Sequence, residues 1–368
     1  MYKVKYILNF KLNIDIINKI GGEMLKKSEI VDFILSNGTV SQKYIIKRDI
    51  LNEDISSAEM SELQQQIVAS KPVQKLLKSQ NTDGWFGYEL HGGPGTAMDC
   101  TVGMLIDIGV EPYHDFMRKA KDALLKNLNP DPRIGRNFYP KVRGYDFSRC
   151  VILGNLHVKG EPLEDELSAS LNQILHIFRI GLEIKSLDEV SKPCTRKKYI
   201  GHRVYLKDKF FPWISDIIAL SSCFECKNSE SVDLMNRAIQ HISNFMPIPV
   251  IFDVAPDSHY IGPISGYSDY AYEDPTDIPK GAIVFWLRDF RRLCSVCELQ
   301  KIPYFYKRAE KLAEYVVNDT MIEKLTDVQL KAIQNIFGYF GKWKNETQKR
   351  IDVYFKCLQL LHESKIDF

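Results

Sequence analysis

The chain has 368 residues, of which 45% are hydrophobic and 26% charged, and its formal net charge is +2. This composition is typical of a folded globular protein and argues against intrinsic disorder. The near balance of charge argues against a nucleic-acid-binding protein, which would carry a basic excess. No long apolar run occurs, so the sequence predicts no transmembrane segment. Eight cysteines in a chain of this length do not make a disulfide framework, so we expect reduced thiols and a cytoplasmic protein.

Residues 1–23 differ in character from the rest of the chain. They form a poor signal peptide, because they contain no clean apolar core and no small-residue cleavage site. Gly21-Gly22-Glu23 precede Met24, and codons for such residues can spell a purine-rich ribosome-binding site. We expect translation to begin at Met24, which would make 1–23 a mis-annotated or disordered extension. An ordinary amphipathic extension is the alternative.

From Met24 onward, the apolar residues predict a series of helix pairs. In the clearest pair, 95–108 is apolar on nearly every side, which is typical of a buried helix, and Gly109 is a natural stop. Pro112 then suits the first turn of an amphipathic helix with one wet face. The same order of a buried and an amphipathic helix recurs along the chain. The expected helices are 28–51 with a break near Gly38, 57–79, 95–108, 113–128, 147–157, 163–178, 213–226, 232–242, 282–296, 303–316, 328–340 and 351–361.

These helix pairs determine the expected fold. No segment shows a convincing alternation of apolar and polar residues, so the sequence predicts no sheet. Repeated inner and outer helices need either an open solenoid or a closed ring. The repeats here are irregular in length and their loops are long, whereas solenoid repeats are usually uniform. We therefore expect an all-α protein in which about six pairs over 24–368 form a single α/α toroid.

One segment carries a family resemblance. Residues 76–87, Leu-Leu-Lys-Ser-Gln-Asn-Thr-Asp-Gly-Trp-Phe-Gly, resemble the glutamine–tryptophan (QW) motif of terpenoid cyclases. Gln80 could hydrogen-bond groups at a helix end, Asp83 and Gly84 would make the turn, and Trp85 would pack against the junction. Together with the helix pairs, the motif makes the chain similar to the terpenoid cyclase/protein prenyltransferase toroid, in its single-toroid form. The motif is structural in that family, so it indicates the fold rather than the reaction.

The resemblance also implies a catalytic acid. Asp99-Cys100-Thr101 matches the Asp-Cys-Thr of oxidosqualene cyclases, at the start of a predicted inner helix. Burial would disfavour the charged form of Asp99, so that it could act as a proton donor. Asp274 and Asp277 resemble less closely the Asp-x-Asp-Asp of squalene–hopene cyclases. The alternatives are a favourable contact with a helix N-terminus for Asp99 and a capped turn at 274–277.

Two Cys-x-x-Cys pairs, Cys223/Cys226 and Cys294/Cys297, fall at equivalent places in consecutive repeats, near the C-terminal ends of predicted inner helices. Successive inner helices of a toroid are neighbours and run parallel, so the four thiols could converge on a structural zinc ion. Packing cysteines are the alternative. The zinc-binding Asp, Cys and His of protein prenyltransferases have no convincing equivalent here.

Basic and aromatic residues are concentrated in and near the long loops that lead into predicted inner helices, where helix N-termini would also point positive. A basic mouth over an apolar cavity suits an amphiphile with an anionic head, such as a prenyl diphosphate. Tyrosines could line the mouth or stabilise a carbocation. Solvated loops are the alternative. The candidate substrate-binding residues are Arg136, Arg143, Arg149, Arg196, Arg203, Tyr267, Tyr270 and Trp286.

Two classes of function are open at this point. The first is a terpenoid-cyclase-like or prenyl-transfer-like enzyme that acts on an isoprenoid or another apolar substrate with an anionic head. The second is a non-catalytic toroid that binds a lipid, a peptide or a partner protein. A deep apolar cavity with a carboxylate at one end would favour an enzyme or a lipid binder, whereas a centre filled by side chains would favour a scaffold.

Overall fold

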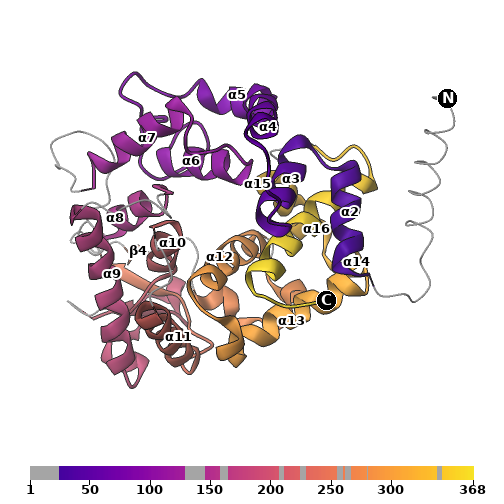
Figure 1. The fold of residues 1–368 in the computed structure, drawn as a ribbon. Helices are drawn as coiled ribbons and strands as arrows, with labels where there is room; N and C mark the ends of the chain where they lie inside the picture. Colours follow the sequence, from indigo (N-terminus) through magenta and orange to yellow (C-terminus); the bar gives the residue numbers. More distant parts are fainter. Residues whose placement is uncertain are drawn as a thin grey trace, which may run out of the picture.

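In a computed structural model the chain is mostly helical (Figure 1), which confirms the all-α class. No helix in the described part of the chain is long and apolar enough to cross a lipid bilayer. The predicted extension 1–23 lies outside the described residues. The structure describes residues 25–128, 146–157, 165–206, 211–223, 229–254, 260–261, 267–279, 281–337 and 342–368.

The first predicted helix is broken at the expected place. Gly38 follows the end of the first segment, and its amide donates to the Ile34 carbonyl at 2.7 Å. Thr39 then caps the next segment, because its side chain and that of Gln42 accept from each other's amides. The segments in this region are α2 (Lys27–Asn37), α3 (Val40–Ile45), the π-helical turn η1 (Ile46–Ile50), α4 (Ser57–Ala69) and α5 (Lys71–Leu77).

Five helices spread along the chain form an inner group. Within it α10 packs against α8 and α12, and α12 packs against α16. Gly103 of α6 lies beside Asn155, just after α8. We call these five the inner helices: α6 (Met98–Asp107), α8 (Asp146–Leu153), α10 (Ile214–Cys223), α12 (Ala282–Val296) and α16 (Glu346–Glu363).

A second group lies outside the first, as Figure 1 shows for α7, α9, α11 and α13. In this group α11 packs against α9 and α13. From α6 to α13, each helix of the first group is followed along the chain by one of the second group. The outer helices are α7 (Asp115–Leu125), α9 (Asp165–Glu183), α11 (Ser229–Ser243), α13 (Pro303–Val317), the short α14 (Met321–Lys324) and α15 (Asp327–Phe337).

The last pair has the opposite order. Every residue from Ile351 to Leu361 is buried, so α16 is an inner helix, although it follows the partly exposed α15. The buried residues include Lys356, whose charge an apolar core would not accept unless a polar space lay beside it.

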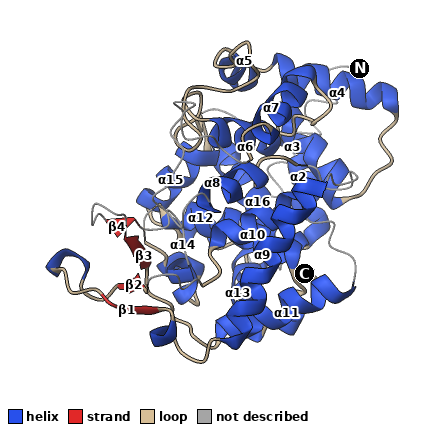
Figure 2. Cartoon of the chain, turned by 90° about the vertical axis from the view of Figure 1, so that its left-hand side faces the viewer, coloured by secondary structure: helices blue, strands red, loops and turns tan. Residues whose placement is uncertain are grey.

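A small sheet lies at one edge of the molecule (Figure 2). The expectation of no sheet is wrong, because these strands are two to four residues long and too short to show alternation. The central pair β2–β3 is parallel, and the outer pairs are antiparallel. The strands are β1 (Ser191–Pro193), β2 (Arg203–Tyr205), β3 (Ile251–Val254) and β4 (Tyr260–Ile261).

The segment that resembles the QW motif folds as a tight turn between α5 and α6. Gln80 Nε2 donates to the carbonyls of Gly84 at 3.0 Å and Phe116 at 2.7 Å, so it ties the turn to α7. Asp83 accepts from the amide of Trp85 at 3.0 Å, and Trp85 is fully buried. The contacts expected of these residues are present in part, while the family resemblance itself stays a prediction.

Candidate functional site

A cavity of about 170 Å³ lies between the inner helices, and we call it the central cavity. Its wall on α12 is one helix face, because residues three, four and seven apart on a helix share a face. The same spacing occurs on α16. The lining residues are Arg288, Arg291, Arg292, Ser295 and Leu287 of α12; Lys356, Gln359 and Glu363 of α16; Gly103, Ile106 and Asp107 of α6; Ser221 and Ser222 of α10; and Gly154 and His157 after α8.

Cationic side chains outnumber carboxylates in this wall, where Arg288, Arg291, Arg292 and Lys356 stand against Asp107 and Glu363. Planar guanidinium groups bind carboxylates and phosphates through paired hydrogen bonds. The central cavity is therefore suited to an anion.

The arginines differ in their pairing. Asp289, which is 1% exposed, forms an ion pair with Arg288 at 2.7 Å and lies 4.0 Å from Arg292. Arg291 makes no ion pair or hydrogen bond with the part of the chain that the structure describes. Its charge is available to a ligand.

Burial and the cationic wall act together on the titratable groups. Burial lowers the pKa of the Lys356 amine to about 8, and Arg291 adds to this effect. Burial alone would raise the pKa of the Asp107 carboxyl, but Lys356 and the arginines hold it below its usual range. Asp107 is therefore ionised near neutral pH, whereas Lys356 exchanges between its charged and neutral forms near pH 8.

Two buried polar atoms of the wall, His157 Nε2 and Gln359 Oε1, have no hydrogen-bond partner among the described residues. Burial lowers the pKa of His157 to about 4, so its ring is neutral at pH 7. The φ of His157 is 49°, in the left-handed region, and its amide donates to Ser222 Oγ at 2.8 Å. Unpaired polar atoms and strained backbone cost stability, and both are concentrated at functional sites.

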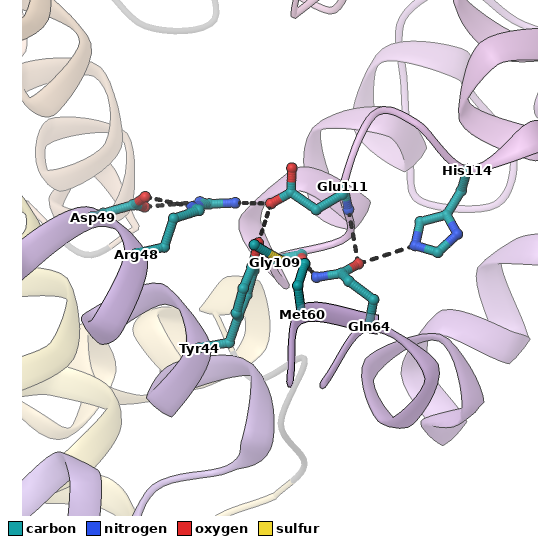
Figure 3. A network of polar contacts seen from close by, with 8 residues as sticks. All are labelled: Tyr44, Arg48, Asp49, Met60, Gln64, Gly109, Glu111 and His114. Atoms are coloured by element: carbon teal, nitrogen blue, oxygen red, sulfur yellow. Dashed lines mark hydrogen bonds and ion pairs between the residues drawn. The ribbon is translucent and has the colours of Figure 1, made fainter. Parts of the chain in front are cut away.

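A second polar cluster joins α3 and η1 to α4 and to the loop after α6 (Figure 3). The Tyr44 hydroxyl donates to Glu111 at 2.5 Å, and Arg48 forms an ion pair with the same carboxylate. Gln64 accepts from the amide of Glu111 at 3.1 Å and contacts His114 Nε2 at 3.0 Å. These side chains satisfy one another, so we interpret the cluster as a structural joint between helices.

Asp99 lies in the first turn of α6, as predicted, and contacts His91 directly. Its Oδ1 also accepts from the amides of Cys100 at 2.6 Å and Gly92 at 3.3 Å. These contacts are typical of an acidic residue at a helix N-terminus, which is the alternative interpretation to a catalytic acid. The role of Asp99 as a catalytic acid stays a prediction.

The two other candidate acids flank the short helix η6 (Pro275–Asp277), with Asp274 as its N-cap and Asp277 as its last residue. Asp274 accepts from the amide and hydroxyl of Thr276 at 2.8 and 2.7 Å, which is the N-cap expected of a turn. Asp277 is exposed. Neither residue lines the central cavity.

Of the predicted arginines, Arg136 and Arg143 lie outside the described residues, and the other three do not line the central cavity. Arg149 donates to Gln173 at 2.6 Å, across α8 and α9. Arg203 donates to Ser191 at 2.7 Å and forms an ion pair with Asp188, so it braces β1 against β2. Arg196 is exposed between these strands.

The predicted aromatic residues Tyr267, Tyr270 and Trp286 are all buried, and none lines the central cavity. Tyr270 and Trp286 both pack edge-on against Phe290, with ring centres 5.7 and 5.0 Å apart. They belong to an aromatic part of the core.

The predicted zinc site is not assembled in the described part of the chain, where no group of three or more potential metal ligands comes together. Cys226 lies outside the described residues. The thiols of Cys223 and Cys297 donate to the carbonyls of Leu153 at 3.0 Å and Leu293 at 3.1 Å. Burial raises the pKa of Cys223 to about 12, so its thiol is protonated. Zinc binding stays a prediction.

The cationic residues of α12 are the ones that sequence reasoning missed. The segment 282–296 is predicted to be buried, yet it contains Arg288, Asp289, Arg291 and Arg292 within five positions. A buried helix accepts such charges only if they face one another or a polar space. This conflict is the signal in the sequence that points to the central cavity.

Comparison of the chain with protein-family models, with curated proteins and with solved structures gave no match.

Proposed function

We propose that the protein binds a small anionic molecule, bearing a phosphate or carboxylate group, in the central cavity. The observation that carries this proposal is the convergence of Arg288, Arg291, Arg292 and Lys356 from two inner helices. Interactions between such groups and an anion are stronger in a partly buried site than in water. The unpaired polar atoms of the wall would then bond to the body of the ligand.

The size and lining of the central cavity favour a small polar ligand. One water molecule needs roughly 10–15 Å³ of such volume, so about 170 Å³ has room for a phosphate with a short polar body. Among the lining residues, Ile106 and Leu287 carry the large apolar side chains. The anionic head of the substrate expected from the sequence would suit this wall, whereas a prenyl chain would meet mostly polar groups.

We also propose that the helices close into the α/α toroid expected from the sequence. The inner helices α6, α10, α12 and α16 line one cavity together with residues just after α8, and α2 packs against α16. The amide of Leu25 donates to the carbonyl of Val317 at 2.7 Å, and that of Lys27 to the carbonyl of Phe368 at 3.2 Å. These contacts bring the two ends of the described chain together, which supports a closed ring.

The anion site is tested by titrating the protein with sulfate and phosphate in a calorimeter. Arg291 makes no ion pair or hydrogen bond in the described part of the chain, and its attraction to Asp107 is offset by its repulsion of the neighbouring cations. Arg291→Gln should therefore change the melting temperature little. The same change should weaken anion binding about tenfold, the effect of losing one charged hydrogen bond. Unchanged affinity in this variant would contradict the proposal.

Arg237→Gln is the matched control, because Arg237 lies on the outer helix α11 in an exposed ion pair with Asp233. Its anion affinity should equal that of the wild type. An equal loss in both variants would mean that sulfate responds to overall charge rather than to a site.

A second candidate function follows from an apolar hollow of about 830 Å³ between α8 and α9. Ile174, Ile177 and Ile180 line it, and Arg149 stands in its wall. The isoprenoid expected from the sequence would lie here, with Arg149 holding the anionic head.

Native mass spectrometry with farnesyl diphosphate separates the two sites. Loss of binding in Arg149→Gln but not in Arg291→Gln would favour the hollow, and the reverse would favour the central cavity. Product formation in the same sample would distinguish an enzyme from a non-catalytic lipid binder.

A further inference from the structure

Lys356 differs from the arginines of the central cavity, because an amine can lose its proton and then act as a nucleophile. The residue is 6% exposed and lies in the middle of α16, on the face that lines the central cavity. Its Nζ lies 5.2 Å from the centre of the Phe355 ring. Lys356 is therefore a buried lysine in the wall of this cavity.

We infer that Lys356 is a catalytic nucleophile that forms a Schiff base with a small anionic aldehyde or ketone bound in the central cavity. The inference rests on the proposed anion site, because Arg291 and Arg292 would hold the carboxylate or phosphate of that compound. Because these arginines lie on the facing helix α12, the carbonyl group of the bound compound would be directed toward Lys356.

The surroundings of Lys356 suit this role. A nucleophilic lysine is activated by desolvation or by a neighbouring cation, and both are present. Burial lowers the pKa of its amine to about 8, and Arg291 lowers it further, while Asp107 and Asp352 act in the opposite direction. A useful fraction of the amine is neutral near physiological pH.

The step balances without an oxidant or a second substrate. The neutral amine adds to the carbonyl carbon, and one of its two protons moves from the nitrogen to the carbonyl oxygen, which gives a carbinolamine. Asp107 is the charged group with the largest electrostatic effect on Lys356, and its carboxylate can accept the proton that the nitrogen gives up. Return of that proton to the hydroxyl releases one water molecule, and the carbon–nitrogen double bond forms.

The test uses pyridoxal phosphate, an aldehyde that carries a phosphate, followed by reduction with sodium borohydride. Reduction converts a Schiff base into a stable amine, which peptide mass spectrometry locates. We expect one adduct per chain at Lys356, formed at least tenfold faster than at any other lysine. Excess sulfate should protect Lys356, because it competes for the same cations.

Three variants make the outcome decisive. Lys356→Met and Lys356→Arg should both lose the adduct, and Lys356→Arg should still bind sulfate because it retains the cation. Lys349→Met is the matched control on the same helix: Lys349 pairs with Glu346 outside the cavity, and its loss should leave the labelling of Lys356 unchanged.

The labelling of Lys356 at the rate of surface lysines, in a protein that binds sulfate normally, would overturn the Schiff-base role and leave the anion site intact. Failure to bind sulfate, together with unselective labelling, would overturn both.

Discussion

Asp107 of α6 and Lys356 of α16 line one cavity from distant parts of the chain, and each favours the charged form of the other. The cationic wall is therefore balanced in part by a carboxylate from an inner helix of the N-terminal half. The stability of the inner group and its affinity for an anion are consequently opposed, because a residue that neutralises the wall also competes with the ligand.

Asp107→Asn should separate these two effects. The change leaves the four cations with less compensation, so we expect a loss of roughly 2 kcal/mol in the free energy of unfolding. Sulfate should bind more tightly and should stabilise the variant more than the wild type. Urea unfolding with and without sulfate measures both, and Asp122→Asn on the exposed face of α7 is the control. A variant as stable as the wild type, with unchanged sulfate affinity, would refute the coupling.

Anion binding should also be coupled to proton uptake by the protein. Sulfate is fully ionised near pH 8, and its charge should raise the pKa of the Lys356 amine from about 8, so the complex takes up part of a proton. The charged groups that act on Lys356 are Asp107, Asp352 and Arg291. The heat of binding should therefore differ between Tris and HEPES buffers for the wild type and agree for Lys356→Met. Equal heats for the wild type would show that sulfate binds away from the lysine.

His157 should make the protein sensitive to acid. Its folded pKa of about 4 lies below the ordinary value of 6.5, so the unfolded chain binds the proton more tightly. The corresponding stability is present above pH 6.5 and is lost as the pH falls towards 4. Each pKa unit corresponds to about 1.4 kcal/mol, so a shift from 6.5 to about 4 gives a loss of at most about 3.5 kcal/mol. Arg292 and Arg291 oppose the charge of the ring, while Asp107 favours it.

His157→Asn is the variant for this test, because asparagine tolerates the left-handed backbone and does not titrate. Its free energy of unfolding should fall less than that of the wild type between pH 6.5 and 4, measured by urea unfolding. His176→Asn, at an exposed position of α9, should behave like the wild type. Parallel pH profiles for all three proteins would exclude a buried neutral imidazole.

The helices could be predicted from the sequence because their determinants are local. The predicted helix 282–296 coincides with α12, and Pro303 begins α13 as expected. Apolar spacing, with glycine and proline at the ends, depends on a few neighbouring residues. The strands could not be predicted, because the pairing of β2 with β3 joins segments too short to carry a pattern of their own.

The set of residues that line the central cavity depends on contacts between distant helices, and the sequence indicates this set only indirectly. The spacing of Arg288 and Arg292 places them on one face of α12, but it does not show that Lys356 lies opposite. The predicted aromatic lining illustrates the same limit. Tyr270 is buried because its loop folds back on α13, where Tyr304 and Arg308 donate to its carbonyl at 3.0 and 2.7 Å.

The turn at Gly84 offers a test of how closely α7 approaches the QW-like segment. Gly84 has a φ of +88°, and a Cβ placed on it would lie 2.4 Å from the carbonyl oxygen of Lys119 in α7. Gly201 has nearly the same φ, +90°, but no atom lies within 4 Å of its Cβ position. The two glycines therefore share one backbone conformation and differ in crowding.

Alanine at each position separates backbone strain from the contact. Gly201→Ala should lower the free energy of unfolding by about 1 kcal/mol, because alanine is strained in the left-handed conformation and meets no neighbouring atom. Gly84→Ala should cost roughly 3 kcal/mol or more, because α7 must also move and the hydrogen bond from Gln80 to Phe116 would be strained. Urea unfolding of both variants measures the difference. Equal losses would mean that the turn and α7 are not in contact, and the joint between the first and second helix pairs would have to be sought elsewhere.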